Sequence, residues 1–195
     1  MRPAYTPSSD ALSYAGRAVH DLGMACLLGG QLFGRLALHP AVTAIGDPAE
    51  RGAVVNLAWR RYGAVNGLGL AVVCANWLAA RMPFGEVAAR NLVPRERRLA
   101  RAKDAFVLLT FAVGVATAIE GTRFARSAPG GAVPLEDGDH TAPGAPGDAA
   151  RRKRRLNALG VAALAAEAGL VVTNAALAQA GFRAAPLRRR ILRGS

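Results

Sequence analysis

The sequence predicts an all-α integral membrane protein, a four-helix bundle with a disordered loop between the third and fourth helices. Four apolar runs have about the length of a membrane span, since a helix rises roughly 1.5 Å per residue and the hydrocarbon core is about 30 Å thick. Arginines gather at the ends of these runs, as is typical of membrane flanks, and give the chain a net charge of +12. The composition, 52% hydrophobic with 6% aromatic residues, is more aliphatic than that of an ordinary soluble fold.

The first predicted span covers residues 18–38 and carries three polar side chains on one side. Gln31 lies about 20° from His20 around the helix and Arg35 about 60°, so we expect this broad face to look inward. A signal peptide is the competing interpretation, but Gln31 and Arg35 interrupt the late part of the run and no clear cleavage site follows. We expect the helix to end at His39–Pro40.

The second predicted span, residues 60–80, is uncharged from position 62 onward. Its small residues recur at every fourth position, which leaves a ridge where another helix backbone can approach closely. Gly30 and Gly34 give the first helix a similar ridge, so we expect the two helices to pack through them. The ridge of the second helix consists of Gly63, Gly67, Ala71, Ala75 and Ala79.

The third and fourth predicted spans cover residues 105–122 and 156–181. Between them, residues 127–150 are rich in Gly, Pro and Ala, hold several acids and lack periodicity, so we expect a disordered loop. The membrane domain would then comprise residues 18–182, between a flexible N-terminus (1–17) and a basic C-terminal tail (183–195).

The basic residues give conflicting evidence on orientation. Seven of them lie in residues 81–103, and with the basic termini they favour the cytoplasm for both chain ends. The run Arg151–Arg155 would then precede the fourth helix on the opposite side, where the positive-inside rule disfavours it. We expect a multi-pass protein of the cell membrane with both termini in the cytoplasm.

Acidic residues inside the predicted spans are candidate functional groups, because burying a charge in the bilayer costs about 2.5–3.5 kcal/mol on insertion scales. Glu167 and Asn174 are seven residues apart on one helix face, and we expect Glu167 to be neutral or paired with polar groups of the first helix. It is either a proton or cation site or a structural contact between helices. Glu120 and Arg35 come to the same membrane side and could neutralise each other. The candidate polar membrane site comprises Glu167, Asn174, Gln31, Arg35, Glu120 and His20.

The sequence lacks the motifs of common catalytic and cofactor sites. Cys26 and Cys74 are the two cysteines and form no CxxC or Cys/His pattern. His20 and His39 are about 28 Å apart along a helix, too far to bind one haem iron, and His140 lies in the loop. The basic residues flank apolar runs instead of alternating with aromatics, so we expect no nucleic acid partner. We expect no metal, no cofactor and no enzymatic activity.

Residues 20–71 resemble an uncharacterised family of small four-span membrane proteins, which includes the eukaryotic transmembrane proteins associated with platinum-drug resistance. The likeness rests on a Gly-x-x-Phe step at Gly30–Phe33, a proline at Pro40, Glu50-Arg51-Gly52, and the entry Trp59-Arg60-Arg61-Tyr62 to the second helix. The resemblance implies four helices and membrane residence, without an established activity. The loop and Arg151–Arg155 depart from the family pattern.

These observations favour a non-catalytic membrane protein that acts as an accessory or assembly component. The alternative is a small transporter or channel in which the buried acid Glu167 would couple transport to protons. A membrane redox enzyme is a third class, which a coloured purified protein would reveal. The expected partners are the lipid bilayer and either a second copy of the chain or another membrane protein.

Overall fold

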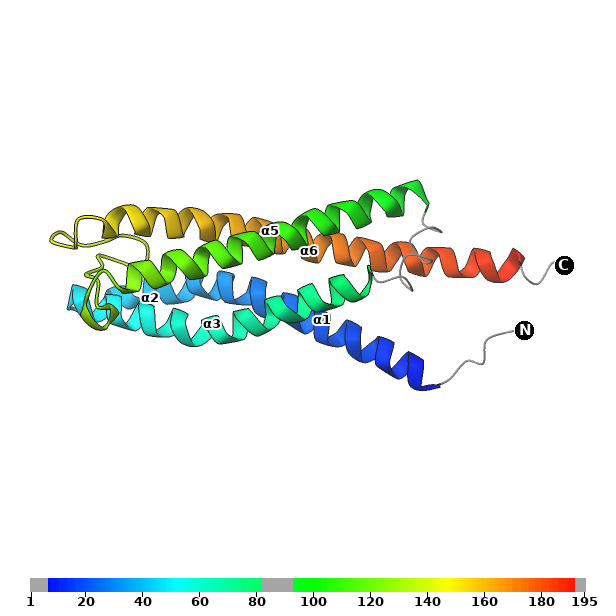
Figure 1. The fold of residues 1–195 in the computed structure, drawn as a ribbon, viewed down its shortest axis with the longest axis horizontal. Coiled ribbons are helices and arrows are strands. Elements are labelled where there is room, and N and C mark those ends of the chain that lie inside the picture. The colour runs from blue at the N-terminus through cyan, green and yellow to red at the C-terminus, as the bar shows by residue number, and fades with distance from the viewer. Residues whose placement is uncertain (1–6, 82–92, 192–195) are drawn as a thin grey trace.

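The computed structural model describes the backbone of residues 7–81 and 93–191, and the side chains of residues 14–81 and 93–180. Over this part the chain is helical and holds no strand, which confirms the all-α prediction. Long helices lie side by side and give an elongated molecule (Figure 1). They are α1 (Pro7–Phe33), α3 (Pro48–Ala79), α5 (Pro94–Ala125) and α6 (Ala149–Ile191); short turns η1 (Gly34–Leu38), α2 (His39–Ala41), η2 (Val42–Ala44) and η3 (Pro129–Gly131) connect them.

The first helix extends beyond the predicted span at both ends. α1 begins at Pro7, so residues 7–17 of the predicted N-terminal segment are helical, while residues 1–6 lie outside the described part. Pro40 does not end the helical path either. A π-helical turn, η1, leads directly into α2, where Pro40 occupies the first turn and its missing N–H has no helical role. The chain therefore stays helical as far as Ala44.

The other long helices also begin earlier than predicted. Asp47 caps α3 by accepting hydrogen bonds from the backbone N–H of Ala49 (2.6 Å) and Glu50 (3.1 Å), so α3 starts twelve residues before the predicted span. α5 starts at Pro94 and α6 at Ala149, which makes each helix longer than a bilayer is thick. α6 continues to Ile191, so most of the predicted C-terminal tail is helical.

The segment between α5 and α6 is ordered, which contradicts the prediction of a disordered loop. Val133 and Leu135 are both 0% exposed and join a core with Val42, Val55 and Phe124. The segment is so rich in Gly and Pro that its composition predicts disorder, although these two apolar residues pack into a core. We use the name cap for the structure formed by α2, η2, the first three turns of α3 and residues 127–148. Figure 1 shows the cap at the end of the molecule opposite the termini.

Arginine and glycine residues of α3 hold the cap segment in place. Arg51 donates hydrogen bonds to the carbonyl oxygens of Glu136 (2.7 Å) and Leu135 (3.5 Å), and the backbone N–H of Leu135 donates to Pro48 O (2.9 Å). The carbonyl of Val133 occupies the space where a Cβ at Gly52 would lie. Arg51 and Gly52 therefore anchor the cap.

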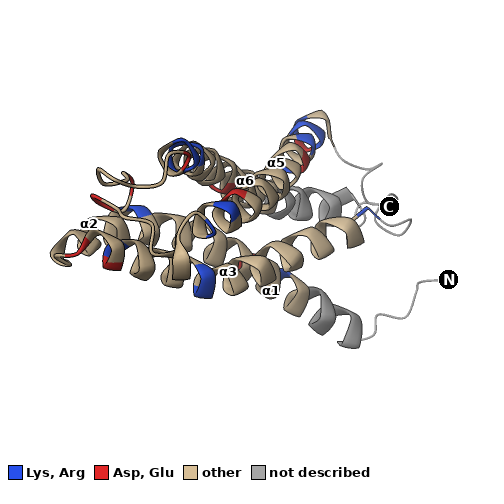
Figure 2. Cartoon of the chain, turned by 60° about the vertical axis from the view of Figure 1, so that its left-hand side comes forward, with Lys and Arg blue, Asp and Glu red and all other residues tan. Residues whose placement is uncertain are grey.

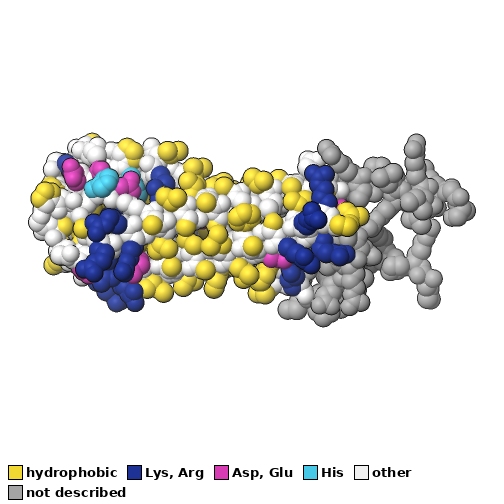
Figure 3. Space-filling model, turned by 90° about the horizontal axis from the view of Figure 1, so that it is seen from above, with side chains coloured by type: hydrophobic (Ala, Val, Ile, Leu, Met, Phe, Trp, Pro, Cys, Tyr) yellow, Lys and Arg dark blue, Asp and Glu magenta, His cyan; other side chains and the backbone are white. Residues whose placement is uncertain are grey.

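A second core joins the long helices away from the cap. Met24 and Leu27 of α1 pack with Val73 of α3, Val107 of α5 and Leu170 of α6. Around this core many large apolar side chains are exposed, and Figure 3 shows them as a band between two groups of Lys and Arg. Three helices, α3, α5 and α6, are long and apolar enough to cross a membrane. α1 does not meet that description, so its span stays a prediction.

α1 and α3 pack closely, but not through the predicted ridge of α3. Gly23 and Gly69 face each other, and a Cβ on either would lie 3.0 Å from the carbonyl oxygen of the other. Gly63 and Gly67 are exposed, with nothing within 4 Å of a Cβ, so their predicted role in packing within the chain is wrong. The ridge turns outward because Val73 occupies the inward face of α3.

Candidate functional site

Among the described side chains, Glu167 is the most buried acidic residue. It lies on α6, is 4% exposed, and its Oε2 has no hydrogen-bond partner in the described part of the chain. Gln31 of α1 is also buried, yet no hydrogen bond joins it to Glu167. Glu167 is buried as expected, and of the two alternatives, a neutral carboxyl or a pairing with the first helix, the described residues show no such pairing.

Arg35 contacts α6 nearer the cap than Glu167. Its Nη2 donates to Asn157 O at 2.7 Å, and the side chain lies against Gly160, where a Cβ would stand 2.7 Å from Nη2. Asn157 in turn donates from Nδ2 to Asp139 O at 2.8 Å. Arg35 therefore links η1 to α6 and, through Asn157, to the cap.

Glu120 of α5 does not pair with Arg35, so that expectation is wrong. Its carboxylate lies 3.2 Å from Arg123, 3.5 Å from Arg152 and 3.9 Å from Arg155. Two of these arginines belong to the first turns of α6, which lie beside the end of α5 (Figure 2). Glu120 thus partly neutralises the basic run Arg151–Arg155, whose position the positive-inside rule disfavours.

His39 forms a buried hydrogen-bonded chain between the cap and α3. Its Nε2 accepts from the indole N–H of Trp59 at 3.1 Å, so Nδ1 carries the proton and donates to Asp139 Oδ1 at 2.9 Å. Burial, with a smaller contribution from Lys153, lowers the pKa of His39, while Asp139 opposes this shift. The sequence indicated only a helix end at His39, because the two partners of His39 lie 20 and 100 positions away in the chain.

Asn174 belongs to a second polar network, at the end of the molecule away from the cap. It accepts from Lys103 Nζ at 2.7 Å and donates to Asp21 Oδ1 at 3.1 Å, which joins α5, α6 and α1. The buried His20 lies 3.3 Å from Asp21 through Nδ1, and its Nε2 has no partner among the described residues. Nearby, Asp104 accepts from Trp77 Nε1 at 2.9 Å.

The six candidate polar residues therefore do not form one site. His20 and Asn174 lie in the network away from the cap, and Arg35 and Glu120 lie near the cap. Glu167 and Gln31 are buried, with no hydrogen bond to the other four among the described residues. Lys103 was missed as a site residue, because the sequence showed it only as one basic residue of a charged segment. Its partners come from other helices, so no local spacing could have revealed them.

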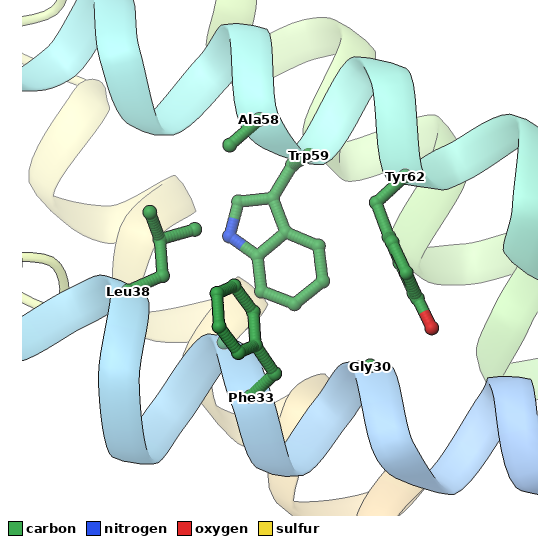
Figure 4. Close-up of a pocket in the computed structure, with 7 residues that line it drawn as sticks. Gly30, Phe33, Leu38, Ala58, Trp59 and Tyr62 are labelled. Atoms are coloured by element: carbon green, nitrogen blue, oxygen red, sulfur yellow. The ribbon is translucent and has the colours of Figure 1, made fainter.

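A small apolar pocket of about 110 Å³ lies between α1, η1 and α3. In Figure 4, Trp59 and Tyr62 extend from α3 toward the helix that carries Gly30 and Phe33. The Tyr62 ring lies over Gly30 and the Trp59 ring over Gly34, so both glycines pack against α3 as the sequence predicts, although against aromatic rings. Tyr62 also donates to Cys26 O at 2.7 Å.

No grouping of His, Cys, Asp and Glu side chains that could hold a metal ion occurs among the described residues. Comparisons of the chain with protein families, curated proteins and solved structures give no match.

Proposed function

We propose that the chain is an integral membrane protein of four spans that acts without catalysis, as an accessory or assembly component. The observation that carries this proposal is the band of exposed apolar side chains between two layers of charge. On α3 the uncharged segment from residue 62 to residue 80 has a length of roughly 30 Å, which matches the hydrocarbon core. α5 and α6 carry exposed apolar residues over the same band.

The partner in assembly would contact α3. Its small-residue ridge is exposed, and no helix of this chain covers Gly63 or Gly67 among the described residues. In a membrane such a ridge favours close approach of another helix, from a second copy or from a different protein. The ridge therefore gives the assembly role a definite surface.

We further propose the cell membrane as the location, with both termini cytoplasmic and the cap on the other side. The seven basic residues of 81–103 support this orientation. Labelling of a single cysteine introduced at His140, in a background without the native cysteines, tests it. Labelling from outside the cell supports the orientation, and labelling only after the membrane is opened contradicts it.

A small proton-coupled transporter is the second candidate, and the unpartnered Oε2 of Glu167 favours it. A buried carboxyl without a hydrogen-bond partner destabilises the fold, and such groups often persist in proteins because function requires them. The resemblance to small four-span proteins bears on neither candidate, because that family has no established activity.

Alkaline carbonate extraction of native membranes, followed by identification of co-purifying proteins, tests the main proposal. We expect the chain to stay in the membrane pellet and to retain a stoichiometric partner, or to form an oligomer, in mild detergent. Recovery as a soluble monomer would refute membrane residence, and a strictly monomeric detergent-solubilised protein would refute the assembly role.

A further inference from the structure

A cavity lined by arginines lies at the cap-side start of α6. It measures about 230 Å³ and is bordered by Asp148, Arg151, Arg152 and Arg155. Glu120 of α5 is within ion-pair distance of two of these arginines. The cavity lies at the end of the α5 and α6 pair, where Figure 2 shows Lys and Arg gathered on α6.

The arginines of this cavity differ in how firmly they are held. Arg152 donates from Nε to Asp148 Oδ2 at 2.6 Å and lies 3.5 Å from Glu120, so its guanidinium is fixed between two carboxylates. Arg155 is 60% exposed and lies 3.9 Å from Glu120, and Arg151 is exposed and makes no hydrogen bond with the described residues. Two guanidinium groups are thus available to an anion, beside a third that holds the cavity wall in place.

The cavity opens beside the apolar band of the molecule. Residues 156–166 of α6 carry no charge, and exposed apolar residues continue the side of α6 that carries Arg151 and Arg154 toward the middle of the helix. Ile119, next to Glu120 on α5, is also exposed. An anion bound to Arg151 and Arg155 would therefore adjoin a surface suited to hydrocarbon chains; the exposed residues of this face of α6 are Ala158, Val161, Ala165 and Val172.

We propose that this cavity binds the phosphate of an anionic glycerophospholipid whose headgroup carries free hydroxyls. Arg151 and Arg155 donate to the phosphate oxygens, since guanidinium groups match phosphate geometry and basic residues at helix ends favour anionic lipids. Asp148, on the cavity wall, accepts from a headgroup hydroxyl. The acyl chains lie along the exposed apolar face of α6. The inference rests on the membrane residence proposed above.

The test measures the thermal unfolding midpoint of the full chain in nonionic detergent during titration with phosphatidylglycerol, phosphatidylcholine or glycerol 3-phosphate. We expect phosphatidylglycerol to raise the midpoint and the other two to leave it unchanged at equal concentration. The double variant Arg151→Gln/Arg155→Gln should bind phosphatidylglycerol about 30-fold more weakly, from the usual contribution of each basic residue at an anionic surface. Arg60→Gln, which removes an exposed charge from α3 outside the cavity, is the control and should behave as wild type.

Each other result overturns a distinct part of the proposal. Equal binding by wild type and the double variant excludes the cavity, and an equal loss in Arg60→Gln reduces the effect to general charge. An equal response to glycerol 3-phosphate identifies a site for soluble phosphate compounds instead of lipid. Failure of membrane residence appears separately, in the carbonate extraction, and does not depend on these variants.

Discussion

Trp59 donates its indole N–H to Nε2 of His39 over 3.1 Å, and this bond connects α3 to the turn that follows the first helix. The two rings meet edge to face, with centroids 5.9 Å apart. Because Nε2 is the acceptor, protonation of His39 would remove the bond and place a second N–H against the indole N–H. The cap should therefore respond to acid.

We predict that stability falls as the pH drops below about 6.5. Burial lowers the pKa of His39 from 6.5, so below that pH the unfolded chain binds more protons than the folded chain and the free energy of unfolding decreases. His39→Gln should remove this part of the pH dependence, measured as the difference in melting temperature between pH 7.5 and pH 5.5. The chain has two tryptophans, so Trp59 fluorescence in a Trp77→Phe background should follow the same titration. A fluorescence signal independent of pH over this range would contradict the prediction.

Substitutions on α3 should separate packing within the chain from association between chains. Gly69→Leu should destabilise the fold by about 1–3 kcal/mol or more, since its side chain meets the carbonyl of Gly23. Gly67→Leu, two positions away and exposed, should leave the melting temperature unchanged and weaken association with the partner. Melting temperature and cross-linked oligomer in native membranes are the two measurements. The opposite pattern, with Gly67→Leu unfolding the monomer, would show that the ridge packs inside the chain.

The cap should lose stability when its buried leucine is shortened. Leu135→Ala removes a side chain that is 0% exposed, and such cavities cost about 2–5 kcal/mol. Limited proteolysis of the segment between α5 and α6 should become faster, while the exposed neighbour Glu136→Ala provides a control whose backbone bond to Arg51 is retained. Equal proteolysis of wild type and Leu135→Ala would indicate a segment that is open in solution.

Glu167→Leu should maintain or raise the melting temperature. The substitution removes a buried carboxyl whose Oε2 has no hydrogen-bond partner, and replacing such a group by an apolar one is usually neutral or stabilising. Glu167→Gln, which retains the shape, is the comparison. A marked loss of stability in Glu167→Leu alone would identify a structural contact. Loss of proton-coupled uptake in reconstituted vesicles, with stability retained in both variants, would support transport.

Local patterns in the sequence were sufficient for the helices and the charge layers. Apolar runs bounded by arginines indicated each long helix, and Gly30 and Gly34 were correctly placed at the contact with α3. The starts of α5 and α6 were missed because helical turns rich in charged residues extend both helices beyond their apolar parts. Capping by Asp47 likewise places the start of α3 before the predicted span. Periodicity of apolar residues does not detect the charged first turns of α5 and α6.

The sequence by itself determined that this chain is all-α, with apolar helices flanked by arginine, because these features depend on neighbours along the chain. Only the tertiary structure decided which faces meet. In the folded chain Gly67 faces outward and Gly69 faces inward, although both are small, because Val73 packs in the core and so sets the inward face of α3. The order of the cap also depends on the tertiary structure. Leu135 is held by contacts with α3 and Asp139 by its hydrogen bond to His39, and both partners are distant in sequence. Such contacts depend on how helices pack against one another, and no local pattern records that.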